Sequence, residues 1–242
     1  MKKQIKLSIL SGLMLLGFQA QAINASDKPI QLSINNSNNS ENAAQRDAFG
    51  GPVFVIDDGN AENSIGDSGQ FIWMNRFTPA VSDFPFQLEE VSVVFGDNLV
   101  NVGDDIEILV YEDTDNDGDP GTNAVLLASF AETIQFNDLT TFNVYTLSMP
   151  VELTGPGDVI VGIVNKSGSE GNADFPAAID QDNSQGRSWV ASYNAGNVPS
   201  NPQLPGDEQW GTIDSFGLPG NWMIRAAGSP SVPVELMNFT VE

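Results

Sequence analysis

Two stretches decide the fold: EEVSVVF at residues 89–95 and IEILVY at residues 106–111. Apolar side chains occupy every second position of both stretches, namely Val91, Val93 and Phe95 in the first and Ile106, Ile108 and Val110 in the second. A period of two predicts β-strands with one face on a hydrophobic core and the other face, which carries Glu90 and Ser92, toward water.

Similar runs recur after Gly50-Gly51, separated by clusters of Gly, Asp, Asn and Pro, which is the pattern of strands joined by turns. We expect strands at Pro52–Ile56, Gln70–Phe77, Gln87–Phe95, Ile106–Tyr111, Val125–Phe130, Thr141–Leu147, Val159–Val164, Ala177–Asp180, Ser188–Tyr193 and Trp222–Ala226. We find no sustained helical period and no internal repeat. About ten short strands predict an all-β, antiparallel β-sandwich of jelly-roll-like form, with a closed barrel as the alternative.

The first 22 residues are predicted to be a signal peptide. Lys2, Lys3 and Lys6 precede an apolar run too short to span a bilayer, and Ala20-Gln21-Ala22 supplies a small-residue cleavage site. No second apolar run reaches transmembrane length, so we expect a protein that is secreted, on the cell surface or periplasmic, with no membrane span in its mature chain. Composition divides the rest into a polar lead-in expected to be flexible (residues 23–49), the sandwich domain (residues 50–228) and a tail or closing strand (residues 229–242).

The chain is strongly acidic, with 32 Asp and Glu residues against nine Lys and Arg residues. Loss of the three signal-peptide lysines would leave six basic side chains. Such a charge repels nucleic acids and anionic membranes, so neither is an expected partner. It suits divalent cations, cationic partners or neutral ligands such as glycans, and it also keeps a secreted protein soluble.

Histidine and cysteine are both absent. Without them the chain has no Ser-His-Asp triad, no thiolate nucleophile and no zinc site of the His or Cys type. The glycine spacing matches neither a phosphate loop nor a dinucleotide fingerprint. Glycoside cleavage by two carboxylates stays open, but adjacent acids are uninformative on so acidic a chain. We therefore expect a non-enzymatic protein, held together by core packing without disulfides.

The strongest local motif is EDTDNDGDPG at residues 112–121. Its carboxylates alternate and a glycine follows, as in the D-x-D-x-D-G opening of calcium loops. Calcium needs several oxygen ligands at once, which alternate side chains supply as the loop curls, and the glycine permits the sharp turn. We predict a Ca²⁺ site with an affinity of roughly 10⁻⁴–10⁻³ M, with the last ligand from the backbone at Asp119 or from another loop. The predicted site residues are Asp113, Asp115, Asp117 and Asp119.

This loop is not an EF-hand, because Ala124 stands where that motif places its bidentate Glu and the flanking runs favour strands. It resembles the Asp-rich calcium turns between strands of secreted proteins. The alternative is a solvated hairpin turn, in which Asp, Asn and Gly are also favoured. Five acids within eight residues repel one another, and a bound cation would remove that cost.

Tryptophan and arginine near the end of the domain suggest a ligand site. Trp210 lies in the polar loop GDEQWGT and is the best candidate for an exposed indole, while Arg187 and Arg225 each lie within three residues of another Trp. Indole faces stack on sugar rings and guanidinium groups bind hydroxyls, so these residues could form a carbohydrate platform. The alternative is that the indoles fill the core and each arginine pairs with an acid. Trp73 is expected in the core.

The segments GRSW (residues 186–189) and PGNWMIRA (residues 219–226) resemble an uncharacterised domain of secreted bacterial surface and adhesin-like proteins. The resemblance covers roughly residues 50–228. It implies a jelly-roll-like sandwich more than an activity, and such domains often lie beside exported peptidases or adhesins. The segment from Pro233 to Phe239 resembles the PVELxxF segment of exported bacterial proteins, which implies a sorting role; a closing strand is the alternative.

Together these features predict a secreted or cell-surface, non-enzymatic binding or structural module, stabilised by calcium. Its partner would be a glycan or a surface protein. The alternatives are a carbohydrate-binding module that uses Trp210 with Arg187 or Arg225, and a carboxylate-based glycoside hydrolase.

Overall fold

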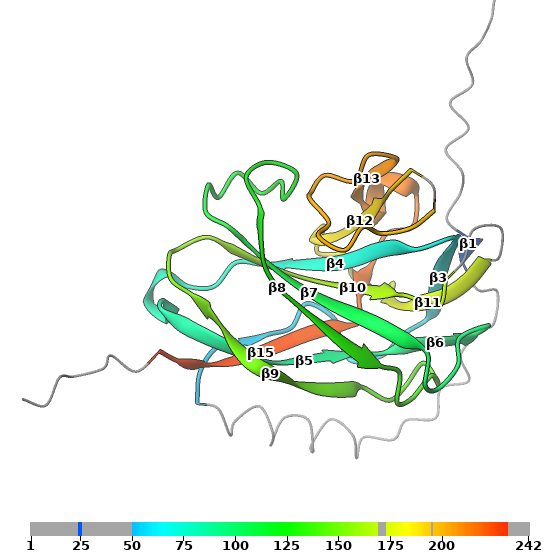
Figure 1. Ribbon diagram of the computed structural model, residues 1–242, viewed down its shortest axis with the longest axis horizontal. Helices are drawn as coiled ribbons and strands as arrows, with labels where there is room; N and C mark the ends of the chain where they lie inside the picture. Colours follow the sequence, from blue (N-terminus) through cyan, green and yellow to red (C-terminus); the bar gives the residue numbers. More distant parts are fainter. Residues whose placement is uncertain (1–23, 26–49, 169–172, 195, 232–242) are drawn as a thin grey trace, which may run out of the picture.

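The computed structural model describes residues 24–25, 50–168, 173–194 and 196–231 (Figure 1). Within these ranges the chain forms strands and two short 3-10 helices, and none of it is a helix long and apolar enough to cross a bilayer. The predicted signal peptide, the lead-in apart from residues 24–25, and the tail beyond residue 231 lie outside the described residues.

The elements follow one another in this order: β1 (Asn24–Ala25), β2 (Val53–Phe54), β3 (Asn63–Ser68), β4 (Phe71–Phe77), η1 (Val81–Asp83), β5 (Phe86–Val93), β6 (Phe95–Asn98), β7 (Asp105–Asp113), β8 (Val125–Thr133), β9 (Asn143–Leu153), β10 (Asp158–Asn165), β11 (Ala173–Asp180), β12 (Ser188–Ser192), β13 (Gln209–Thr212), η2 (Ile213–Phe216), β14 (Asn221–Trp222) and β15 (Ile224–Pro230).

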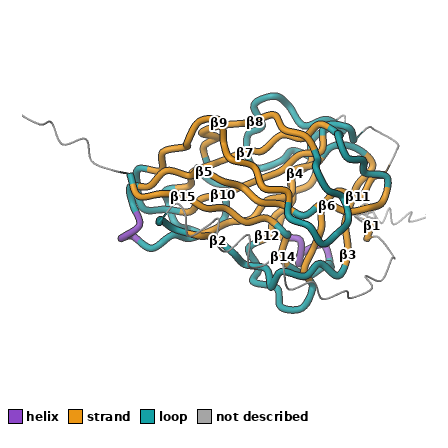
Figure 2. The backbone as a smooth tube through the Cα atoms, turned by 90° about the horizontal axis from the view of Figure 1, so that it is seen from below, coloured by secondary structure: helices purple, strands orange, loops and turns teal. Residues whose placement is uncertain are grey.

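The strands form two packed layers, which lie one above the other in Figure 1 and are seen from below in Figure 2. One layer is a six-stranded sheet in the order β13-β12-β4-β10-β7-β8. The other consists of a four-stranded sheet, β2-β15-β5-β9, and a sheet in the order β1-β3-β11-β14 with β6 also paired to β11. Every pairing is antiparallel, and neighbours such as β4 and β10 are far apart in sequence. The predicted jelly-roll-like β-sandwich is confirmed, and β13 and β8 end the large sheet, so it does not close into a barrel.

Two long strands connect the sheets of the second layer. Val94 separates β5 from β6, and Met223 separates β14 from β15. The two breaks are hydrogen-bonded to each other, since the Val94 amide donates to the Met223 carbonyl at 3.0 Å. Both residues are buried in a small cluster apart from the main core, so the breaks do not expose the strands.

All ten predicted strands are present, and the structure adds others. The clearest addition is β3, whose sequence NSIGDS is typical of a turn. It forms a strand because Ile65 is fully buried and β11 supplies a partner. A β-carbon on Gly66 would lie only 1.6 Å from the Asp174 carbonyl oxygen, so this close approach requires glycine.

The predicted alternation holds on the core side only. The three apolar residues of each stretch quoted above lie together in the main core: Val91, Val93, Phe95, Ile106, Ile108 and Val110. The prediction that Glu90 and Ser92 face water is wrong, because both are 2% exposed. The outer face of this sheet carries further packing, in which the Arg225 guanidinium lies 4.2 Å from the centre of the Phe142 ring. Long amphipathic side chains thus cover the outer face of the strand, which the alternation of residues alone would assign to solvent.

A buried polar clamp joins the two layers where β14 and β15 are interrupted. Asn75, on the core face of β4, donates from Nδ2 to the carbonyl oxygens of Trp222 (2.8 Å) and Ile224 (2.9 Å). Ser188 Oγ donates to Asn75 Oδ1 at 2.7 Å and accepts from the Trp222 amide at 2.9 Å. These side chains satisfy backbone groups that the broken ladder leaves without strand partners.

The first and last strands of the described domain are neighbours. Phe54 and Val53 of β2 pair with Ala226 and Ala227 of β15, and the Gly228 amide donates to the Pro52 carbonyl at 3.0 Å. The two ends of the region that begins at residue 50 therefore lie side by side in the four-stranded sheet.

Candidate metal site

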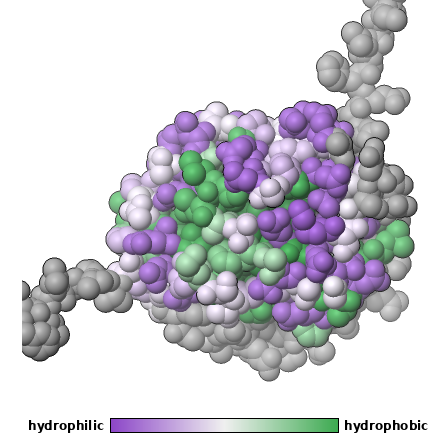
Figure 3. Space-filling view, viewed as in Figure 1, coloured by the Kyte–Doolittle hydropathy of each residue, from purple (hydrophilic) through white to green (hydrophobic). Residues whose placement is uncertain are grey.

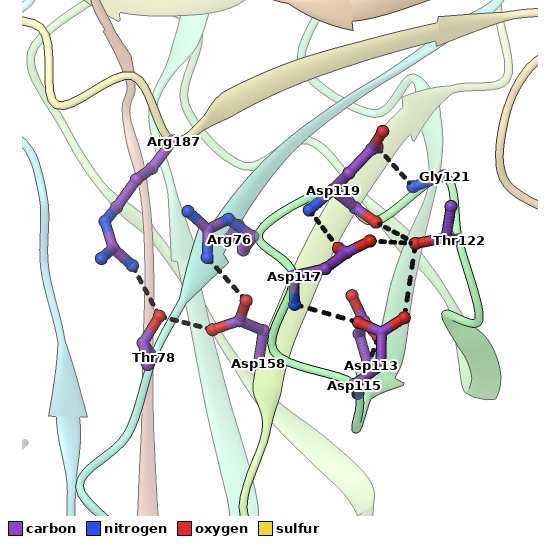
Figure 4. A network of polar contacts seen from close by, with 10 residues as sticks. All are labelled: Arg76, Thr78, Asp113, Asp115, Asp117, Asp119, Gly121, Thr122, Asp158 and Arg187. Carbon is purple, nitrogen blue, oxygen red and sulfur yellow. Dashed lines mark hydrogen bonds and ion pairs between the residues drawn. The ribbon is translucent and has the colours of Figure 1, made fainter.

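The loop between β7 and β8 lies at one end of the six-stranded sheet (Figure 1). Its backbone curls through three left-handed residues, Asn116 (φ 57°), Gly118 (φ 85°) and Asn123 (φ 63°), a conformation that Asn and Gly tolerate best. Each carboxylate accepts from the amide two residues on, as when the Asp117 amide donates to Asp115 Oδ1 at 3.1 Å and the Asp119 amide to Asp117 Oδ1 at 2.7 Å. These turns bring alternate side chains toward one point (Figure 4).

Three of the four predicted ligands meet there. Asp113, Asp115 and Asp117 each offer a carboxylate oxygen, and these oxygens lie within 4.8 Å of one another. Asp113 is fully buried at the end of β7, whereas the other two are exposed. Asp113 Oδ2 has no hydrogen-bond partner among the described residues. Burial raises the pKa of Asp113 to about 6, and the neighbouring carboxylates add to the increase.

Asp119 lies outside this cluster, which corrects the prediction for its carboxylate. Its Oδ1 accepts from the Gly121 amide at 2.9 Å, and its carbonyl oxygen accepts from the Thr122 amide at 3.1 Å. The side chain therefore shapes the second turn of the loop, and the carbonyl is engaged there as well.

Two neutral residues that the motif did not identify orient the exposed carboxylates. Asn123 Nδ2 donates to Asp115 Oδ2 at 2.8 Å, and Thr122 Oγ1 donates to Asp117 Oδ2 at 2.7 Å. The bond from Asn123 is the main reason why the pKa of Asp115 is lowered. Both residues directly follow the motif in the sequence. That position is the only feature of the sequence from which their role could have been inferred.

Arg76 lies beside the loop. Its Nη1 pairs with Asp158 Oδ2 at 2.6 Å, and a β-carbon on Gly118 would lie 3.7 Å from its Nη2. Thr78 also donates to Asp158, and Arg187 Nη1 donates to the Thr78 hydroxyl at 2.7 Å (Figure 4). Arg187 thus belongs to a polar network that ties β4 to β10 and β12.

The predicted platform of Trp210 with Arg225 is not assembled. Arg225 is 6% exposed and forms a buried ion pair with Asp57, with two N–H···O distances of 2.9 Å. It lies in the four-stranded sheet, whereas Trp210 lies on the edge strand of the six-stranded sheet. For Arg225 the structure confirms the alternative that the arginine pairs with an acid.

Most of the tryptophan side chains lie in the core. Trp73 and Trp222 are buried in the main core, and Trp189 is 9% exposed in a second cluster. Trp210 is half-buried rather than exposed, and its ring packs on Trp189 with centroids 5.0 Å apart. Trp210 also contacts the Asp-rich loop: a β-carbon on Gly121 would lie 2.8 Å from its Nε1.

A second buried carboxylate, Asp174, lies apart from this cluster. Its Oδ2 accepts from Asn165 Nδ2, while Oδ1 has no hydrogen-bond partner among the described residues. Burial raises its pKa from 3.8 to about 6, and repulsion from Asp104 and Asp67 contributes. Below pH 4 the group is protonated in both the folded and the unfolded chain. Its stabilising contribution is therefore complete below about pH 4 and is lost as the pH rises through about 6.

We expect Asp174→Asn to raise the free energy of unfolding at pH 7 and to leave it nearly unchanged at pH 4, since the amide cannot ionise. Urea unfolding at both pH values measures the difference, and Asp105→Asn, at an exposed position, is the control. An equal effect of Asp174→Asn at the two pH values would contradict the assignment.

No protein-family profile and no curated protein matches the chain. Among solved structures, the chain is similar to one described as the cysteine protease and lectin-like domains of Cwp84, a surface layer associated protein of Clostridium difficile. The TM-score is 0.50 at 14% identity, over 74% of this chain and 36% of that chain. A structure of clostridial cysteine protease Cwp84 after propeptide cleavage gives 0.44 at 16% identity, over 69% and 37%. The chain thus spans little more than a third of the first structure, and at this identity the likeness shows the fold alone.

Proposed function

We propose that this protein is a secreted or cell-surface β-sandwich module, non-enzymatic, that binds one calcium ion at Asp113, Asp115 and Asp117. The observation that carries the proposal is the buried Asp113 Oδ2, which has no hydrogen-bond partner among the described residues and belongs to a cluster with two further carboxylates. A buried carboxylate oxygen without a donor is costly, and a cation satisfies it.

The spacing of the carboxylates suits calcium. Ca²⁺ lies 2.3–2.6 Å from its ligands, so oxygens on opposite sides of the ion are about 4.6–5.2 Å apart. The three oxygens within 4.8 Å can therefore contact one ion. Two exposed ligands leave room for water, which is typical of a site with modest affinity.

The wider role rests on the sequence and on the fold. The predicted signal peptide and the acidic surface favour export, and the similar structure comes from a protein described as surface layer associated. That structure includes a cysteine protease, for which this cysteine-free chain has no nucleophile of that type. We propose a glycan or a surface protein as the partner. For a carbohydrate-binding role, the half-buried indole of Trp210 is still a candidate contact, whereas Arg225 is engaged with Asp57.

We expect calcium at about 10 mM to stabilise the protein by about 1.4–2.7 kcal/mol if the dissociation constant is roughly 10⁻⁴–10⁻³ M. That corresponds to a rise in Tm of about 3–10 °C, measurable by calorimetry. Asp115→Ala should abolish the gain. Asp182→Ala, which removes an exposed acid elsewhere, should preserve it. A melting curve that calcium leaves unchanged would refute the site.

A further inference from the structure

The proposed calcium loop forms the surface on which Trp210 packs. A β-carbon on Gly121 would lie 2.8 Å from Trp210 Nε1 and 3.0 Å from Cε2, so the indole lies directly on the loop backbone. The same point is 3.0 Å from Asp119 Oδ1, the atom that accepts from the Gly121 amide. The other neighbour of the indole is the Trp189 ring, at an interplanar angle of 30°. Trp210 is therefore held between the loop and its own sheet.

Strand β13, which carries Trp210, is an edge strand that is followed directly by the buried residue Ile213. It is four residues long, all of them half-buried, and it is the terminal strand of its sheet. Among the described strands, only β12 pairs with it, from Trp189 opposite Thr212 to Ser192 opposite Gln209. Short edge strands with one partner open more easily than central strands. The contact between the indole and the loop therefore adds to the pairing with β12 in holding β13.

We infer that calcium binding in the Asp113–Asp117 loop fastens strand β13 to the sandwich through Gly121 and Trp210. The inference rests on the proposed calcium site. Without an ion, three clustered carboxylates repel one another and favour open arrangements of the loop. Each opening displaces the backbone that supports the indole, and the ion removes the repulsion.

The coupling must be reciprocal. If calcium tightens the docking of Trp210, then loss of the indole weakens calcium binding by the same factor. Coupling of this kind is typically 5–150-fold, and a contact of one side chain with one glycine belongs near the lower limit. We therefore expect Trp210→Ala to weaken calcium binding roughly 5-fold.

The test combines calorimetric calcium titration with hydrogen exchange of the full chain, with and without calcium. We expect calcium to slow exchange at β13, residues 209–212, as well as in the loop. Gly121→Ala inserts a methyl group under the indole and beside Asp119 Oδ1, but it meets none of the carboxylates of Asp113, Asp115 and Asp117. It should keep calcium binding, at an affinity lowered several-fold, and lose the calcium-dependent protection of β13. Gly155→Ala is the matched control, because a β-carbon there meets no atom within 4 Å.

The outcomes separate the two proposals. Calcium binding with protection confined to residues 113–123 would overturn the coupling and leave the calcium site standing. No binding heat at millimolar calcium would overturn the site and the coupling together. Protection of β13 that survives in Gly121→Ala would also overturn the coupling, since the indole contact would then not carry it.

Discussion

Asp57→Ala is expected to lower the free energy of unfolding by about 3–5 kcal/mol. The Asp57 carboxylate is fully buried and accepts hydrogen bonds from both Nε and Nη2 of Arg225, whose side chain is 7% exposed. Removal of the acid leaves a guanidinium charge without its counterion in a site closed to water, and that uncompensated charge is the main cost. Urea unfolding followed by fluorescence measures the loss.

Two further variants isolate the cause. Asp58→Ala removes the exposed neighbouring acid and should change the free energy of unfolding by less than about 1 kcal/mol. The double change Asp57→Leu with Arg225→Met replaces the pair by apolar groups and should recover most of the loss, because no charge then stays buried. If Asp57→Ala were as mild as Asp58→Ala, the ion pair would not have the role assigned to it.

Asn75→Leu is expected to cost roughly 3 kcal/mol or more, although leucine has a similar volume. The change removes both donors to the carbonyls of Trp222 and Ile224 and the acceptor of Ser188 Oγ. Each buried polar group left unsatisfied costs about 1–3 kcal/mol. Ser188→Ala should cost less, since it removes one donor and one acceptor but leaves both carbonyls bonded.

Asn60→Leu, at an exposed loop position, is the control for the chemical change itself. Thermal and urea unfolding give the comparison. A stable Asn75→Leu variant would show that the layers stay joined without the clamp, and that the breaks at Val94 and Met223 accommodate their free backbone groups in another way.

The sequence predicted the strands well because alternation depends on local residue type. Ile106, Ile108 and Val110 had to share a face, and they do. It missed β3 and β13, because NSIGDS and QWGT become strands only through partners distant in the chain. The sequence also predicted that Glu90 faces solvent. A period of two shows on which face of the sheet a residue lies, but it does not show what packs against that face.

At the candidate site, too, local features were predicted and long-range contacts were missed. The D-x-D-x-D-G spacing brought Asp113, Asp115 and Asp117 together, because a curling loop places alternate side chains on one side. The same rule did not bring Asp119 into the cluster, although its carboxylate accepts the amide two residues on as the other three do. The packing of Trp210 on Gly121 joins residues almost ninety positions apart, and no local pattern encodes it.

The pairing of β2 with β15 has a mechanical consequence. Because Val53 lies opposite Ala227, force applied between residues 52 and 228 loads the Val53–Ala227 and Phe54–Ala226 pairs one after the other. These two pairs would open in sequence rather than resist in shear, and the load would then pass to the pairing of β15 with β5.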